Sequence, residues 1–506
     1  MLPARMMTGQ GNTPFRITTS NPKAQEFFNQ GVAQLHSFWA VEAERSFLQA
    51  AQLDPQAPMP QWGIAMVAAG DYRPRFQLGS GRRNTNDARA PQGGAARAQA
   101  AAKKALELSA APGKATELEK MYIAAIAARR DRKSKDADKA YIAGLRAIVE
   151  AYPDEVEAKT YLALHLMQGF VTPTKTPREG SMEAAQILRE LLVKAPDHAG
   201  VHHYVIHGFE GSTFAKDAWP SCRRYPELTS NIPHALHMPG HIWAQTGKWE
   251  EAAASFESAA QNERGYMKAD KLYTRGHHGH NVHFLITTYS FQGRYDKAVE
   301  AAQELLAMKE NPREAGQIDN ALTAYRQGWL GLLRSMVQSE KWDEILAGQT
   351  LPVYDKPREQ AWRHWALAQA HVAKGNLEAA KSETQAMEAA MKLLKSKTKQ
   401  KAPLQLQVAR KELEGQLALA ANKTDKGLNL LQAAVRQERA LRYQEPPAYP
   451  RPVAEVLGQK ALQAGKLAVA ANAFRQALEQ YPESSRARAG LAEVQKRDGR
   501  VVAGGL

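Results

Sequence analysis

Eleven of the fifteen histidines in this 506-residue chain lie between His198 and His283. All of these except His198 fall in three strings, HHYVIHGFE at 202–210, PHALHMPGHIW at 233–243 and HHGHNVHFL at 277–285. Each string holds a pair separated by three or four residues: His203 and His207, His237 and His241, His280 and His283. Imidazoles at this spacing lie on one face of a helix, where an i, i+4 pair can chelate a transition-metal ion. The spacing therefore predicts a metal site built on helices.

Composition restricts the ligands of such a site. Cys222 is the single cysteine, which excludes an internal disulfide, a cysteine-ligated zinc knuckle and a CxxCH haem attachment. Any metal must be held mainly by nitrogen and oxygen. The 67 Lys and Arg against 52 Asp and Glu give a net charge of +15. This charge is scattered and lacks interleaved aromatic residues, so it favours a solvated basic surface over a specific nucleic-acid site.

The chain is rich in Ala, Leu, Glu, Gln and Lys in helical periodicity, which predicts an all-α protein. A repeat with a period of 34 residues refines this prediction. Small residues, an aromatic residue and a proline recur at the spacings of a tetratricopeptide repeat, as in Gly31, Phe47 and Pro55 and again in Gly458, Phe474 and Pro482. We expect a right-handed superhelical solenoid of tetratricopeptide repeats, with about nine to eleven helix pairs.

Three regions are expected along the chain. Residues 1–22 form an N-terminal extension, 23–310 a solenoid that carries the histidines, and 311–506 further repeats with a capping helix. Two segments break the pattern, a Gly-, Arg- and Asn-rich stretch at 79–94 and an insertion at 169–181. Long loops on a rigid array either line a site or are plain surface excursions, and the sequence leaves both open.

Aligned by repeat, the three histidine pairs take positions on the first helices of three consecutive copies. In tetratricopeptide solenoids these positions face the concave groove, and neighbouring helices pack about 8–10 Å apart. We therefore expect one histidine patch across the groove, with Glu210 beside it. His36 aligns near the end of an N-terminal first helix and His234 near the start of its own. Two alternatives to metal remain, binding of a peptide or anion by the histidines and no specific role.

A resemblance supports treating the histidines as a set. The three strings, together with LHSFWAVEAERSFLQAAQLDP and WGIAM near the N-terminus, resemble a family of bacterial tetratricopeptide-repeat proteins with HxxxH-type motifs. The similarity spans roughly residues 25 to 300 and implies that His36 is an additional member of the set. The family implies no particular reaction.

An almost purely imidazole ligand set suits copper or zinc, and the Irving–Williams order favours copper. The leading hypothesis is a copper oxidoreductase with one or two ions, whose predicted ligands are His203, His207, His237, His241, His280, His283 and His36. Glu210 would orient a histidine or take a proton from a small organic or peptide substrate in the groove. The alternatives are a zinc hydrolase on the same ligands and a non-catalytic scaffold that binds a partner protein or carries metal.

The compartment is inferred from chemistry alone. No stretch approaches the ~20 apolar residues of a membrane helix, and the N-terminus has no apolar signal-peptide core. Copper chemistry and low cysteine use favour the periplasm or the exterior over the cytoplasm.

Overall fold

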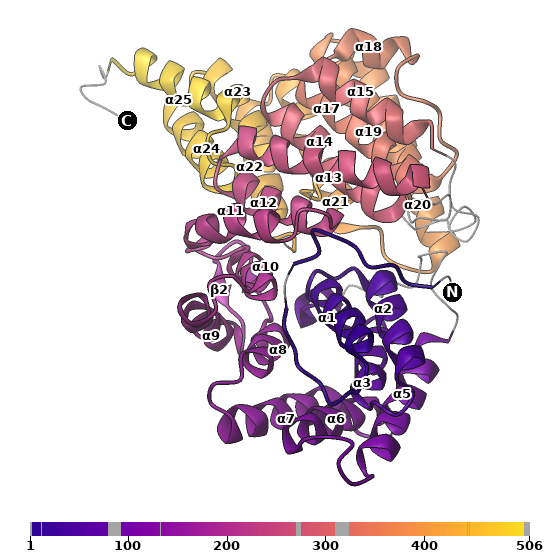
Figure 1. Ribbon diagram of the computed structural model, residues 1–506. Coiled ribbons are helices and arrows are strands. Elements are labelled where there is room, and N and C mark those ends of the chain that lie inside the picture. Colours follow the sequence, from indigo (N-terminus) through magenta and orange to yellow (C-terminus); the bar gives the residue numbers. More distant parts are fainter. Residues whose placement is uncertain are drawn as a thin grey trace. The chain divides into compact units, whose positions relative to one another are not determined.

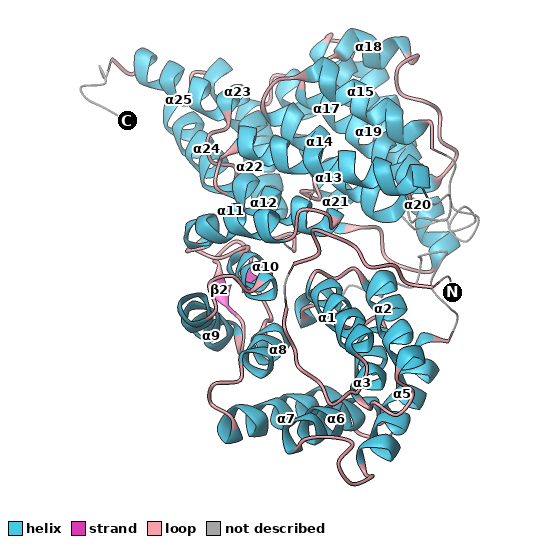
Figure 2. Ribbon diagram, viewed as in Figure 1, coloured by secondary structure: helices cyan, strands magenta, loops and turns pink. Residues whose placement is uncertain are grey.

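A computed structural model describes residues 3–11, 13–78, 93–131, 133–269, 275–308, 323–442, 444 and 446–499. These residues are helical almost throughout, and the one sheet among them is a two-stranded ribbon (Figure 2). The all-α fold expected from the sequence is confirmed.

The elements up to residue 245 are, in chain order, α1 (Pro22–His36), α2 (Ala40–Leu53), α3 (Met59–Val67), α4 (Arg75–Leu78), α5 (Gly94–Ser109), α6 (Glu117–Arg130), α7 (Ala137–Ala151), α8 (Val156–Leu166), β1 (Phe170–Val171), β2 (Thr176–Pro177), α9 (Ser181–Lys194), α10 (Ala199–Phe209), the 3-10 helix η1 (Ala215–Ala218), α11 (Trp219–Leu228) and α12 (Pro233–Gln245). The remaining elements are α13 (Trp249–Ala269), α14 (Arg275–Phe291), α15 (Tyr295–Leu306), α17 (Ala324–Gln338), α18 (Trp342–Ala347), α19 (Pro357–Ala373), α20 (Leu377–Thr398), α21 (Leu404–Ala420), α22 (Thr424–Arg439), α23 (Val453–Gln463), α24 (Leu467–Gln480) and α25 (Ser485–Arg497).

A common turn joins the helices into hairpins. Within the described ranges, seven helix pairs are joined by three residues, of which the central one has a positive φ. These central residues are Phe38, Gly247, Gly293, Glu340, Gly375, Asn422 and Gly465. A left-handed residue after a helix lets the next N–H groups satisfy the last carbonyls and reverses the chain. The chain is therefore a tetratricopeptide-type array of antiparallel helix pairs.

The glycines and aromatic residues of the sequence pattern are the contacts inside these pairs. A Cβ on Gly31 would lie 2.6 Å from the ring of Phe47, and one on Gly458 would lie 2.5 Å from Phe474. No side chain fits at either place, because the aromatic ring of the second helix already fills it. The two residue types therefore recur together, 16 positions apart, at both ends of the chain.

The chain divides into two compact units (Figure 1). The first comprises Met1–Val171, Lys175–Ile242 and Ser258–Thr274, and the second comprises Thr172–Thr174, Trp243–Glu257 and Arg275–Leu506. The expected boundaries at residues 22 and 310 stay a prediction. The insertion at 169–181 contains the antiparallel ribbon β1–β2 between α8 and α9. Nearly all of the expected loop at 79–94 lies outside the described residues.

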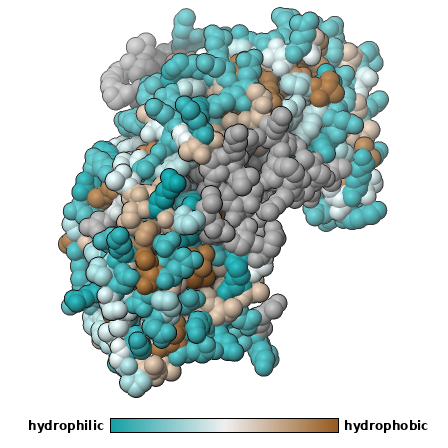
Figure 3. Space-filling view, turned by 45° about the vertical axis from the view of Figure 1, so that its right-hand side comes forward, coloured by the Kyte–Doolittle hydropathy of each residue, from teal (hydrophilic) through white to brown (hydrophobic). Residues whose placement is uncertain are grey.

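On the face that Figure 3 presents, the described residues are mainly hydrophilic, with separate hydrophobic spots among them. Among the described helices, none is long and apolar enough to cross a membrane.

Glu438 makes the stability of the second unit depend on pH. Burial, together with the nearby carboxyl groups of Glu412 and Glu455, raises the pKa of Glu438 to about 8, although the Val453 N–H donates to it at 2.8 Å. In an unfolded chain the pKa is about 4.3, so the folded state holds an extra proton between about pH 4.3 and 8. Stability is therefore highest below this window and falls as the pH rises through it.

We expect Glu438→Gln to raise the free energy of unfolding at pH 8 by at least about 1 kcal/mol, with no gain near pH 4. Thermal unfolding measured across this range checks the prediction. Glu479→Gln, whose side chain is 64% exposed, is the control. If the free energy of unfolding varied with pH in the same way for Glu438→Gln and for the wild type, Glu438 would be ionised in the folded protein.

Candidate metal centre

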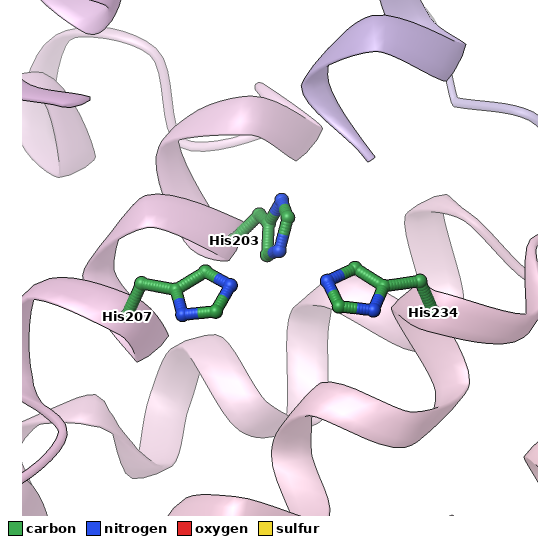
Figure 4. A group of neighbouring side chains, drawn as sticks. All are labelled: His203, His207 and His234. Atoms are coloured by element: carbon green, nitrogen blue, oxygen red, sulfur yellow. The ribbon is translucent and has the colours of Figure 1, made fainter. Parts of the chain in front are cut away.

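Three histidine side chains from two helices converge inside the first unit. His203 and His207 lie one turn apart on α10, and His234 lies in the first turn of α12. One ring nitrogen of each lies within 4.8 Å of those of the other two, and the residues are 0, 2 and 8% exposed. Figure 4 shows the three rings facing one another across a common space. A metal ion bonded to nitrogen at about 2.0–2.1 Å needs a somewhat tighter arrangement of the same kind.

The protons of His203 are arranged as a metal ligand requires. Its Nδ1 donates to the backbone carbonyl of His36, so its Nε2 carries the lone pair. Nε2 is buried and has no hydrogen-bond partner among the described residues. Burial, with a smaller contribution from His207, holds the pKa of His203 well below its usual value. The ring is therefore neutral, with its unprotonated nitrogen available.

Nδ1 of His207 has two polar neighbours. It lies 3.5 Å from a carboxylate oxygen of Glu210 and 3.3 Å from the side-chain amide nitrogen of Gln77, which donates to it. The buried Nε2 of His207 has no hydrogen-bond partner within the described part of the chain. Burial lowers the pKa of His207, although Glu210 partly offsets this effect. The two neighbours favour opposite tautomers, because Glu210 favours a proton on Nδ1 and the Gln77 amide favours a lone pair there.

Glu210 connects this group to a second pair of imidazoles. It follows α10, and its Oε1 lies 2.7 Å from Nδ1 of His241. Nε2 of His241 in turn lies 2.7 Å from Nε2 of His237, one helical turn away on α12. Burial alone would raise the pKa of Glu210, but His241 and His207 outweigh burial and hold the pKa well below its usual value. An ionised carboxylate therefore orients imidazoles on two helices.

Aromatic rings enclose the three histidines. The Phe38 ring centroid lies 4.5 Å from that of His203, 5.4 Å from that of His207 and 5.6 Å from that of His234. The ring of Tyr225 also stacks on that of His203, with centroids 5.0 Å apart and an angle of 12° between the planes. Phe38 is 3% exposed, so the imidazoles lie in an interior and not on the open groove surface that the sequence suggested.

A second group lies behind His203. Nε2 of His36 bonds Glu157 at 2.7 Å, and Nε2 of His198 bonds the other oxygen of the same carboxylate at 2.8 Å. The remaining nitrogens are also engaged, because Tyr204 donates to Nδ1 of His36 at 3.0 Å and the Val201 N–H donates to Nδ1 of His198 at 3.2 Å. These contacts make the group a hydrogen-bonded clamp that holds the end of α1.

The charge of this clamp is fixed by its surroundings. Burial alone would raise the pKa of Glu157, but His36 and His198 outweigh burial and hold the pKa well below its usual value. Burial lowers the pKa of His36. An ionised carboxylate therefore accepts two imidazole N–H groups in the interior.

The structure thus brings together part of the predicted set in the first unit. His203 and His207 lie with His234 in a group that could hold a metal ion, and His237 and His241 contact each other next to Glu210. His234 was not among the predicted ligands, although His234, His237 and His241 recur at i, i+3 and i+7 and so already share one helix face. His36 reaches the group through its backbone carbonyl, and its role as a ligand stays a prediction.

His280 and His283 lie on α14 in the second unit. His283 is buried, with Nδ1 against Oε1 of Gln327 and with no hydrogen-bond partner for Nε2 among the described residues. Burial, with a contribution from Arg334, lowers the pKa of His283 to about 3. Convergence of these two histidines with those of the first unit stays a prediction.

Comparisons with known proteins report a likeness of fold. No protein-family model and no curated protein matches the chain. Similar solved structures include the human IFIT1 dimer with m7Gppp-AAAA (TM-score 0.35, 13% identity, 94% of this chain and 91% of that chain). Others are the Cut9–Hcn1 hetero-tetramer of the APC/C (0.29, 11%, 93% and 90%) and yeast Tom70 (0.29, 10%, 94% and 89%). At these scores the likeness carries no argument about function.

Phe38 occupies a turn position that four other hairpins fill with glycine. Its φ of +54° costs about 1–2 kcal/mol for a residue with a Cβ. Removing a buried phenylalanine ring costs about 3–5 kcal/mol. We therefore expect Phe38→Gly to lower the free energy of unfolding by about 2 kcal/mol, because the lost packing on the imidazoles exceeds the strain that is relieved.

Chemical denaturation checks this expectation, with Asn422→Gly as the matched control. Asn422 takes the same turn position with a φ of +59° and is exposed, so glycine there should cost no stability. If Phe38→Gly were as stable as the wild type, the ring would have no part in holding the histidine cluster together.

Proposed function

We propose that this protein binds a transition-metal ion at His203, His207 and His234 and acts as a copper oxidoreductase. The observation that carries the proposal is a buried ring nitrogen without a partner on each of two neighbouring imidazoles. At His203 and His207 the protein engages Nδ1 and leaves a buried Nε2 without a hydrogen-bond partner among the described residues. A buried polar atom without a partner costs free energy, which a ligand at that atom would recover.

The donor set supports copper as the ion. Three imidazoles supply the nitrogen ligands that copper and zinc both accept, and copper binds such sites more tightly. The enclosing rings of Phe38 and Tyr225 keep the surroundings apolar, which strengthens electrostatic interactions within the group. A copper ion held there would supply one-electron redox chemistry, while the chain holds the rings in position.

The contacts of Glu210 favour an orienting role over that of a general base. Its carboxylate faces Nδ1 of His241 and Nδ1 of His207, and its low pKa makes it a weak base near neutral pH. A zinc hydrolase would require a residue that takes a proton from water, so these contacts support the oxidoreductase before the hydrolase. A metal carrier without turnover remains the second candidate, and the deep burial of the ligands favours it.

Elemental analysis of the untagged full-length protein tests the proposal. We expect copper to bind at His203, His207 and His234, and we expect His234→Ala to remove about one copper per chain without loss of helicity. His364→Ala is the matched control, because His364 lies on α19 in an ion pair with Glu383 and should leave the metal content unchanged. Zinc in place of copper would favour the hydrolase, and an unchanged copper content in His234→Ala would overturn the site.

Copper without turnover would identify a carrier. Oxygen consumption with phenols and other oxidisable organic substrates separates the two cases. A copper-loaded protein that consumes no oxygen with any of them would contradict the oxidoreductase while leaving the metal site intact.

Glu210→Gln is expected to weaken copper binding by about 10–100-fold, the usual effect of removing a carboxylate that orients a ligating histidine. The glutamine has nearly the same shape and can still accept one hydrogen bond, so the fold should be unaffected. Competition with a chelator of known affinity measures the change. An affinity equal to that of the wild type would mean that Glu210 does not orient the ligands.

A further inference from the structure

The N-terminal segment crosses the first unit as an extended chain. Residues 3–11 and 13–21 form no helix or strand, and Figure 1 shows them as an indigo trace beside α1. Thr13, Phe15 and Ile17 are buried, whereas Pro14 and Arg16 are exposed. This alternation is that of an extended peptide with one side against a surface.

Two glutamines of α1 bind the backbone of this segment in the same way. Gln30 accepts from the N–H of Met7 at 2.7 Å and donates to the carbonyl of Arg5 at 2.9 Å. Gln25 accepts from the N–H of Ile17 at 2.9 Å and donates to the carbonyl of Phe15 at 2.9 Å. Each amide therefore pairs with the carbonyl of one residue and the N–H of the residue two positions later. Such contacts recognise an extended backbone whatever its side chains.

Further side chains hold the same stretch. The carboxylate of Glu119 on α6 accepts from both the N–H and the hydroxyl of Thr18 at 2.6 Å. The amide oxygen of Asn29 accepts from the N–H of Phe15 at 3.3 Å. The backbone from Phe15 to Thr18 is therefore bound mainly by side chains of the helices.

One side chain of the segment is bound specifically. The ring of Phe15 lies 5.7 Å from that of Phe28, 5.7 Å from that of Trp62 and 5.2 Å from that of Tyr122, between centroids. These rings belong to α1, α3 and α6. Helix α3 packs against both α1 and α6, and these helices in turn pack against α2, α5 and α7. The surface that receives Phe15, which we term the N-terminal face, is thus held by helix packing.

The segment does not satisfy every polar group at this face. Trp62 Nε1 is buried and has no hydrogen-bond partner among the described residues. Such a group costs free energy that a different occupant could recover. A segment with no secondary structure of its own also opens at low cost compared with a packed helix.

We propose that the N-terminal face is a binding site for an extended segment of a partner protein, and that residues 13–18 occupy it as a tethered competitor. The partner segment carries an aromatic residue followed, two positions later, by a β-branched residue. Main-chain hydrogen bonds supply affinity and alternate side chains supply specificity, as in other sites for extended peptides. The tether favours the internal segment through an effective concentration of about millimolar. The proposal does not depend on metal.

The first experiment uses full-length protein and a labelled synthetic peptide with the sequence of residues 10–20. Phe15→Ala in the full chain weakens the internal segment and leaves the N-terminal face intact. We expect the peptide to bind this variant at least about 10-fold more tightly than it binds the wild type, in which the internal segment competes. The same peptide with alanine in place of its phenylalanine is the control and should not bind.

A second variant tests whether the glutamine contacts are used. Phe15→Ala combined with Gln25→Ala should lose the binding gained by Phe15→Ala alone, with an unchanged circular dichroism spectrum. Peptide binding that does not need Gln25 would overturn the proposed site. Concentration-dependent dimers of the wild type, with no peptide binding, would show that the occupant is the segment of a second copy, and this result also overturns the proposal.

Hydrogen exchange on the wild-type protein gives an answer that does not rely on a variant folding. The amides of Phe15 and Ile17 should exchange at least about 10-fold faster than the buried amides of α1, because the segment opens while the helices remain folded. Equal protection would mean that the segment opens only when the unit unfolds, and the proposal would be wrong.

Discussion

The interior of the first unit depends on one property of the imidazole ring, that a neutral ring has a single N–H and a single lone pair. Burial keeps His203 and His207 neutral, so each must place one donor and one acceptor in an interior that water does not reach. For His203 the chain provides an acceptor, the carbonyl of His36, whereas Nδ1 of His207 lies between the carboxylate of Glu210 and the donating amide of Gln77. The lone pair on Nε2 of His203 is then left without a partner among the described residues, as a metal ligand requires.

Buried carboxylates extend this arrangement. Glu210 and Glu157 are both held ionised by imidazoles, each carboxylate lying between two of them. The two carboxylates also join elements distant in sequence, since Glu157 on α8 holds the end of α1 while Glu210 links α10 to α12. Ligand orientation and helix packing therefore depend on the same contacts.

The helix pairs hold the histidine cluster in a fixed arrangement, and their side chains bind the N-terminal segment. Repeated three-residue turns and glycine–aromatic contacts fix the pairs, and Phe38 replaces glycine in the turn that lies over the histidines. The side chains that bind residues 5–18 come from helices held by their own packing. The scaffold thus presents two distinct candidate sites, the histidine cluster proposed for an ion and the N-terminal face proposed for an extended backbone, and neither proposal requires the other.

The sequence by itself determined the helices, their pairing and the helix faces that carry histidine. Gly31 with Phe47, and Gly458 with Phe474, could be read as contacts because a hairpin with a fixed turn brings residues 16 positions apart together. The pair His203 and His207 followed from helical periodicity, which is a local property. Only the tertiary structure decided that His234 joins this pair, that the His36 ring turns to Glu157 and that residues 13–18 pack on α1. Contacts between helices depend on how each helix is rotated and shifted against its neighbours, and this is set by the packing of all side chains at once and not by spacing along the chain.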